Sequence, residues 1–438
     1  MPSDMEESGG SVGSSRMAAI TLVAGQVLAA AAAFLVNLLA ARVLDPAPRG
    51  DLAFALQLSY FFSVLAVMGL ERPYMATRAG SFNSEYRSFA RMVLPGTIAV
   101  IPLIFLVTAV SPFSFSWLWL GAAVLTAYVV LNSLTLAVRV AYVSSRNWKQ
   151  FALNAIAAQL IIVLGAGVLT FLEVRDPILW MGIYALSGLP ALFLLWMAWR
   201  TGPVINSPTL IEQKLLRRRG WILLPSTFSN MAMLRADRLL LPVLSSSAQL
   251  GLYVTVATVM EMATWPVQQW VDASLRQWAQ SPGMPTKFIR HLMFRSFLLL
   301  TLLSALLGVA AWVMVETFLP DSYQAAKAVI LPLAVASVIY GMTRVQEGIL
   351  IAFGAEARVA VIEIVGALVA IAAYVLLIPA FGMLGAAYGS ILGYLACAIT
   401  AWVLITGLKR PTPEEQPSQE SAPLPRTSLA SDPLKERK

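Results

Sequence analysis

The chain is divided almost completely into apolar segments of about 20 residues, which short polar stretches separate. A helix needs roughly 20 mostly apolar residues to cross the hydrocarbon core of a bilayer. Of the 438 residues, 58% are hydrophobic and only 12% are charged, whereas a soluble domain carries about 25% charged residues. The sequence therefore predicts an all-α, polytopic membrane protein and excludes a water-soluble fold.

Twelve transmembrane helices are expected. Their ranges are Met17–Ala41, Leu52–Leu70, Met92–Val110, Phe115–Val138, Phe151–Leu172, Ile178–Trp199, Trp221–Leu244, Leu252–Val271, Phe297–Leu319, Ala325–Phe353, Val359–Ile378 and Leu384–Leu408. The tenth span contains Pro332 and is long enough to be tilted or kinked.

The spans form two sets of six. We expect a six-helix N-terminal half at 17–199, a cytoplasmic linker at 200–220 and a six-helix C-terminal half at 221–408. The segment NLLAARVLDPAPRGDLAFALQL is echoed by DRLLLPVLSSSAQLGLYVTVATV, and in each a helix end and a turn precede a Gly, Gly50 or Gly251. Because repeated halves often produce alternating access with the substrate at their interface, a central cavity is expected between them.

The two ends of the chain have a different composition. Residues 1–16 are rich in Ser and Gly, and residues 409–438 are rich in Pro, Ser and Glu. Segments with so few large apolar groups cannot offset the entropy of ordering, so both are expected to be disordered.

The loops after the even-numbered spans contain seventeen Lys and Arg residues. Those after the odd-numbered spans contain three, namely Arg42, Arg49 and Arg175, and Lys327 lies at the start of the tenth span. Short basic loops stay on the cytoplasmic side, so both termini are expected in the cytoplasm. This asymmetry also accounts for the net charge of +8, and we expect no nucleic-acid partner.

Single residues exclude several kinds of site. Cys397 is the only cysteine and His291 the only histidine, so neither a disulfide nor a Cys-based metal site is expected within one chain. No G-x-x-x-x-G-K-[ST] loop is present, so ATP is not expected as the direct driver. The sequence predicts no cofactor and no metal.

Charged residues within the expected spans are confined to the second half. The first half offers neutral groups such as Asn37, and its acids map to loops or span ends. A charge at the centre of a span costs about 2.5–3.5 kcal/mol on insertion scales and therefore faces a bundle interior or a cavity. The candidates for a site among them are Arg235, Asp237, Arg238, Glu261, Arg344, Glu347 and Glu363.

Arg235 and Arg238, and likewise Arg344 and Glu347, are spaced to share one helical face. A face with two arginines suits a phosphate, because guanidinium groups form bidentate, charge-assisted hydrogen bonds. We therefore expect substrate binding by Arg235, Arg238, Arg344 and Asn37. The coupling or cavity acids would be Asp237, Glu261, Glu347 and Glu363. The alternative is that Arg344–Glu347 and Arg238–Asp237 only neutralise one another.

Three stretches resemble the polysaccharide flippases of the Wzx type, in the superfamily that also holds the multidrug and oligosaccharidyl-lipid exporters. LAARVLDPAPRGDLAFALQL resembles the family's opening hairpin, RADRLLLPVLSSSAQLGLYVTVATVMEMATWPVQQWVDAS its span 7–8 signature, and IPAFGMLGAAYGSILGYL its span 11–12 turn. The likeness extends from Met17 to Leu408. The turn at 45–48 departs from the family's usual Gly-Pro turn.

The resemblance implies a transporter in the bacterial inner membrane. Its cargo would be an isoprenoid diphosphate that carries an oligosaccharide, moved from the cytoplasmic to the periplasmic face for O-antigen, capsule or exopolysaccharide assembly. The implied partners are this lipid-linked oligosaccharide, membrane lipids, and the polysaccharide polymerase and chain-length proteins.

Two other classes stay open. A cation-coupled multidrug antiporter of the same superfamily has a similar fold, but the first half shows no carboxylate within its expected spans, and arginines suit a cationic drug poorly. A membrane polysaccharide polymerase needs acids or bases on extramembrane loops, and the expected periplasmic loops are very short. The sequence therefore favours a flippase over an enzyme.

Overall fold

The computed structural model describes residues 31–110, 118–145, 147–200, 208–280 and 286–407. These residues form helices and connecting loops, with no strand among them. The first helix, Ala31–Val43, is followed by α2 (Pro46–Val67), α3 (Glu71–Thr77), α4 (Phe82–Val110), α5 (Leu118–Ser144), α6 (Trp148–Phe171), α7 (Pro177–Leu186), α8 (Leu189–Arg200), α9 (Leu210–Leu244), α10 (Ser247–Glu261), α11 (Trp265–Gln280), α12 (Thr286–Val313), the π-helix η1 (Met314–Phe318), the 3-10 helix η2 (Asp321–Val329), α13 (Ile330–Ala352), α14 (Glu356–Phe381) and α15 (Met383–Thr406).

Every expected span coincides, over its described residues, with one helix or with consecutive helices. Within the described part of the chain, nine helical segments are long and apolar enough to cross a membrane, and the bent pair α10 and α11 makes a tenth. The expectation of an all-α, polytopic membrane fold is confirmed. The expected disordered ends at 1–16 and 409–438 lie outside the described residues, as does the start of the first span.

The helices differ strongly in burial. In the most apolar part of α2, 72% of the residues are buried, compared with 6% in α6. The exposed positions of α6 are themselves apolar, for example Leu164 and Val168. An apolar outer surface of this extent is typical of a membrane-facing helix. Thus α2 is a central helix and α6 a peripheral one.

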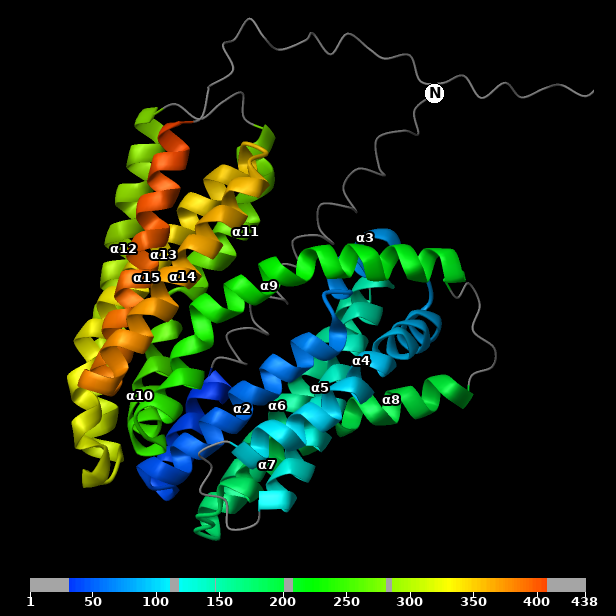
Figure 1. The fold of residues 1–438 in the computed structure, drawn as a ribbon, viewed down its shortest axis with the longest axis horizontal. Helices are drawn as coiled ribbons and strands as arrows, with labels where there is room; N and C mark the ends of the chain where they lie inside the picture. The colour runs from blue at the N-terminus through cyan, green and yellow to red at the C-terminus, as the bar shows by residue number, and fades with distance from the viewer. Residues whose placement is uncertain (1–30, 111–117, 146, 201–207, 281–285, 408–438) are drawn as a thin grey trace, which may run out of the picture.

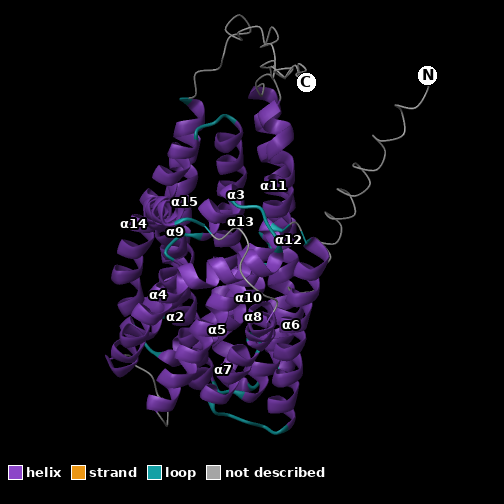
Figure 2. Cartoon of the chain, turned by 90° about the vertical axis from the view of Figure 1, so that its right-hand side faces the viewer, coloured by secondary structure: helices purple, strands orange, loops and turns teal. Residues whose placement is uncertain are grey.

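The helices gather into two groups (Figure 1), and the view from the side shows that most run along a common direction (Figure 2). One group contains α2 to α8 and the other α10 to α15, and α9 runs from one to the other. The groups meet where α2 crosses α10.

The crossing of α2 and α10 has a reciprocal geometry. A Cβ atom on Gly50 would collide with the carbonyl oxygen of Ser247, and one on Gly251 with the carbonyl oxygen of Pro46. Each of these carbonyls lies four residues before the other glycine. The two segments that echo one another in the sequence therefore contact one another in space, and small residues allow their backbones to approach closely.

Several helices begin earlier than the sequence indicates. Helix α2 begins at Pro46 rather than Leu52, because proline is well suited to the first helical position. Arg49 and Asp51 are therefore helical and buried. Helix α4 likewise begins at Phe82 and buries Glu85. The expectation that the acids of the first half lie in loops or at span ends is wrong for Asp51, which lies beyond the first turn of α2, and it holds for Glu85, which lies in the first turn of α4.

Other expected elements are interrupted or extended. The expected linker is helical from Leu210, where a capping box of Thr209 and Glu212 starts α9. The expected eighth span is broken into α10 and α11, which are bent by 41°. Pro332 lies in the first turn of α13, directly after the 3-10 helix η2, so the expected tenth span changes helix type next to the proline.

Candidate substrate cavity

A cavity of about 880 Å³ lies between the two groups of helices. The helix Ala31–Val43, α2, α3, α5, α6 and α7 line it from one group, and α10, α13 and α14 from the other, together with α9. This is the central position that the two-half architecture predicts.

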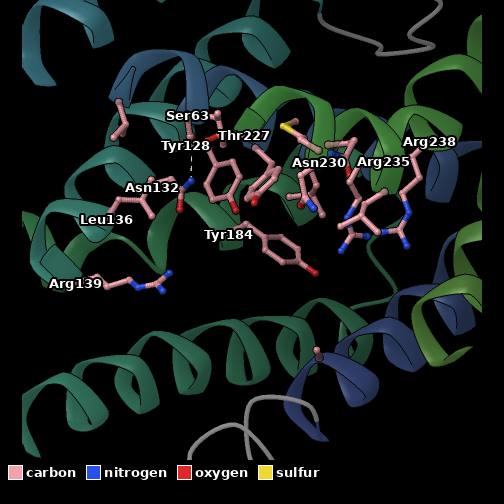
Figure 3. Close-up of a pocket in the computed structure, with 18 of the residues that line it drawn as sticks. Ser63, Tyr128, Asn132, Leu136, Arg139, Tyr184, Thr227, Asn230, Arg235 and Arg238 are labelled. Atoms are coloured by element: carbon pink, nitrogen blue, oxygen red, sulfur yellow. Dashed lines mark hydrogen bonds between the residues drawn. The ribbon is translucent and has the colours of Figure 1, made fainter. Parts of the chain in front are cut away.

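The cavity is closed at one end and extends towards the other. Next to the α2–α10 crossing, which we call the closed end, the two groups of helices are joined by hydrogen bonds: Ser247 donates to Asp51 (2.6 Å), and Tyr323 donates to the carbonyl oxygen of Leu44 (2.8 Å). At the opposite end the lining includes Arg72 and Arg139. Figure 3 shows the lining as a row, with Arg139 at one end and Arg235 and Arg238 at the other.

Arginines dominate the charged lining. The structure brings the predicted Arg235, Arg238, Arg344 and Asn37 to this one cavity. Three further arginines from the first half line it as well: Arg49, Arg72 and Arg139. The carboxylates in the lining are those of Glu71 and Glu363.

Arg235 and Arg238 bind the same carboxylate. Nη1 of Arg235 donates to both oxygens of Glu261, at 2.9 and 3.0 Å, and Nη2 of Arg238 donates to Oε1 of Glu261. Glu261 itself lines a second, smaller cavity of about 170 Å³ inside the second half, and Arg235 lines both cavities. This ion-paired cluster therefore forms part of the wall between the two cavities.

Asp237 faces the smaller cavity instead of pairing with the guanidinium of Arg238. Its carboxylate accepts hydrogen bonds from the backbone N–H of Arg238 (2.8 Å) and from the hydroxyl of Tyr253 (2.6 Å). The guanidinium of Arg238 therefore pairs with Glu261. It does not pair with Asp237, contrary to the alternative in which Arg238 and Asp237 neutralise one another.

The other two predicted acids occupy different places. Arg344 donates to Glu347 at 2.6 Å, as the alternative reading of this pair predicts, and Glu347 is buried outside the lining of either cavity. Glu363 lines the large cavity, where it accepts a hydrogen bond from Asn230 (2.8 Å). Of the four acids predicted from the sequence, one therefore faces the large cavity directly.

Arg49 lines the cavity, although the hydropathy pattern places it in the loop between the first two expected spans. Its guanidinium donates to Oδ1 of Asn37, while Nδ2 of Asn37 donates to the carbonyl oxygen of Thr255 in the second half (3.1 Å). Among the described residues Arg49 has no carboxylate partner, and its Nε atom has no hydrogen-bond partner. The signal that identifies it is Pro46, because a proline at the first helical position places Arg49 in the first turn of α2.

Solved structures with this fold are membrane transporters. An inward closed structure of the lipid II flippase MurJ matches with a TM-score of 0.66 and 10% identity, over 88% of this chain and 87% of that chain. An inward-facing multidrug resistance transporter of the MATE family, in the MOP superfamily, matches with a TM-score of 0.62 and 13% identity, over 84% of this chain and 93% of that one. An outward-facing structure of a multidrug resistance MATE-family transporter matches with a TM-score of 0.59 and 13% identity, over 88% of this chain and 94% of that chain.

No family model and no curated protein matches the sequence. The likeness to these MATE-family and MurJ structures, at 10–13% identity, shows a shared fold.

Proposed function

We propose that this transporter-fold protein moves an isoprenoid-diphosphate-linked oligosaccharide across the bacterial inner membrane for the assembly of a surface polysaccharide. The observation that carries the proposal is the convergence of arginines from both halves on one cavity. The fold supports transport in general, and the charge of the cavity supports an anionic cargo.

The arginines fit a diphosphate in number and kind. Guanidinium groups form paired, charge-assisted hydrogen bonds with phosphate oxygens. Arg49 approaches from the first half, and Arg235 and Arg238 approach from the second. A headgroup between them would be held by both halves, so its binding would be sensitive to their relative position.

The cavity volume fits a headgroup and its first sugars. Pockets of about 300–1,000 Å³ hold drug-sized molecules, and the volume here is about 880 Å³. Neutral polar side chains such as Tyr128, Asn132 and Gln159 lie along the lining and suit sugar hydroxyl groups. The isoprenoid tail would stay in the lipid, because apolar chains gain nothing by entering a polar cavity.

Glu261 would act as an internal substitute for the cargo. In the conformation described, its carboxylate holds Arg235 and Arg238. A diphosphate that enters the large cavity would compete for these guanidinium groups and leave Glu261 facing the smaller cavity. A proton taken up there would lower the cost of the unpaired carboxylate, which links cargo binding to proton uptake in the second half.

The positive-inside rule assigns a direction to the cavity. Arg72 and Arg139 stand at the end that the sequence places in the cytoplasm. The closed end, at Gly50 and Gly251, would then face the periplasm. The cavity would load from the cytoplasm, and opening of the α2–α10 crossing would release the cargo outside. The polymerase and chain-length proteins would act after that step.

A cation-coupled multidrug antiporter is the competing function. Its support is that MATE-family transporters share this fold. The arginines of the lining argue against it, because they would repel a cationic drug. A polymerase is disfavoured because the structural neighbours are transporters.

The test is transport of a fluorescent isoprenoid-diphosphate oligosaccharide in proteoliposomes. Arg235→Ala and Arg344→Ala should abolish transport while leaving expression intact. Arg219→Ala, on the exposed start of α9, is the matched control and should transport normally. Near-normal transport by both cavity variants would contradict the proposal. In the host, gene deletion should trap lipid-linked sugar on the cytoplasmic face, whereas altered drug tolerance with unchanged lipid-linked sugar would favour the antiporter.

A further inference from the structure

We propose that the outer surface where α4 packs against α8 is a binding site for the phosphate headgroup of an anionic phospholipid. The site consists of Arg87 and Arg91 on α4, and of Trp196, Trp199 and Arg200 on α8. It is separate from the cavity, whose lining includes none of these residues.

Each guanidinium group of the site lies over an indole ring. The Cζ atoms of Arg87 and Arg91 lie 5.6 and 5.2 Å from the centroid of Trp199, and that of Arg200 lies 3.8 Å from the centroid of Trp196. Cation–π contacts operate within about 6 Å. Such stacking uses the face of the guanidinium and leaves the N–H groups at its edge free to bind phosphate.

Two of the three arginines in the site, Arg91 and Arg200, are exposed. Within the described chain, neither Arg91 nor Arg200 forms a hydrogen bond or an ion pair with another residue. Arg87 is buried and donates to the carbonyl oxygen of Ala198 (3.2 Å), which holds the two helices together. By contrast, Arg78, also in the first half, is neutralised by Glu85. Within the described residues, these two exposed guanidinium groups are therefore held by stacking and have no carboxylate partner.

The neighbouring surface indicates a lipid as the source of that anion. Trp196 and Trp199 are 50% and 55% exposed, and the exposed Phe193 stacks on Trp196 at 5.8 Å. The exposed Leu189 and Leu192 continue this apolar surface along α8. Tryptophan at the level of basic residues is typical of the membrane interface. An anionic phospholipid fits both parts of this surface, because its phosphate would bind the arginines and its acyl chains would pack against the apolar residues.

Two exposed arginines on α9 provide the comparison for the arginines of this site. Arg218 and Arg219 on α9 are also exposed, yet neither stacks on an aromatic ring in the described chain. They carry the same charge as Arg91 and Arg200 without the fixed orientation. Specific binding should therefore depend on Arg91 and Arg200 and not on Arg218 and Arg219.

The test is native mass spectrometry of the full-length protein in detergent, titrated with phosphatidylglycerol or phosphatidylcholine. We expect saturable binding of phosphatidylglycerol, about tenfold weaker in Arg91→Gln/Arg200→Gln and changed less than twofold in Arg218→Gln/Arg219→Gln. Trp199→Leu should weaken binding as well, because it removes the stacking. Each variant is first compared with the wild type for thermal stability, and Arg91→Gln alone replaces the double variant if that one unfolds.

Three outcomes would overturn the proposal. Equal loss of binding in both double variants would mean that only net charge matters. Equal affinity for phosphatidylcholine would mean that the site does not select an anionic headgroup. Displacement of the lipid by excess inorganic phosphate would mean that it is a free-anion site.

Discussion

Arg235 and Glu261 form a two-point contact in the wall between the two cavities, in which one guanidinium nitrogen donates to both carboxylate oxygens at 2.9 and 3.0 Å. Arg238 binds the same carboxylate. These two guanidinium groups are thus held by an internal anion, which the proposed diphosphate cargo would have to replace.

Glu261→Gln removes this competing charge and should therefore tighten the binding of farnesyl diphosphate, a short isoprenoid diphosphate, by about tenfold, or about 1.4 kcal/mol. Isothermal titration calorimetry in detergent measures the change. Glu316→Gln is the matched control, because Glu316 pairs with Lys327 away from both cavities. Unchanged or weaker binding in Glu261→Gln would show that Glu261 positions the arginines and does not compete with the ligand.

Arg49→Gln should weaken binding of the same probe by about tenfold or more, because it removes a buried guanidinium that has no carboxylate partner in the described chain. Arg42→Gln is the matched control, since Arg42 is exposed and lies outside the lining. If the two variants bind equally well, Arg49 serves only to hold Asn37 against the second half.

Gly50→Leu should open the closed end of the cavity, because a side chain there meets the backbone of Ser247. Replacing the only cysteine, Cys397, by Ala and adding Thr258→Cys in the cavity lining provides a single labelling site. A membrane-impermeant thiol reagent applied from the closed side should label this site faster when Gly50→Leu is added than in the parent protein, which carries only Cys397→Ala and Thr258→Cys.

The control for that experiment is Gly167→Leu on α6, where a Cβ atom would have nothing within 4 Å. Its labelling rate should equal that of the parent. The same slow rate in Gly50→Leu would mean that the crossing of α2 and α10 does not control access from that side.

Arg78→Gln should lower the free energy of unfolding by about 3 kcal/mol, because it leaves the buried carboxylate of Glu85 without its cation. Burial, together with the Glu85 carboxylate, raises the pKa of Tyr74 well above its usual range, so its hydroxyl stays protonated and donates to Glu85 at 2.7 Å. That single hydrogen bond does not replace the charge of Arg78.

Thermal unfolding in detergent, followed by tryptophan fluorescence, measures the loss. Arg218→Gln serves as the exposed control and should unfold like the wild type. Adding Glu85→Gln to Arg78→Gln should recover part of the stability, since no buried charge then remains unpaired. No recovery would mean that Arg78 stabilises the fold through packing.

The spans were predictable because the bilayer sets their length. Over its described residues, each expected apolar run is mostly helical. Apart from the break between α10 and α11, the errors lie at the polar ends, where membrane insertion does not dictate the boundary. Pro46 shows this for α2: hydropathy starts the span at Leu52, whereas the helix starts at the proline. Arg49 was misplaced for the same reason.

The site was predictable as a set of residue types and not as a set of contacts. Arg235, Arg238, Arg344 and Asn37 were found because charges and amides within spans are costly and therefore face a cavity. The partners of these side chains were not predictable, because the guanidinium of Arg238 binds Glu261 and not the adjacent Asp237. Helical neighbours at i and i+1 point in different directions.

The sequence by itself determined that this protein is a bundle of membrane-spanning helices with polar groups turned inward, because the solvation energies of its side chains in lipid leave no other arrangement. Only the tertiary structure decided which charges meet, where the cavity closes, and that Arg49 joins the second half's arginines around one space. Those outcomes depend on how the two groups of helices pack at Gly50 and Gly251, a contact between residues far apart in the chain that no local pattern encodes.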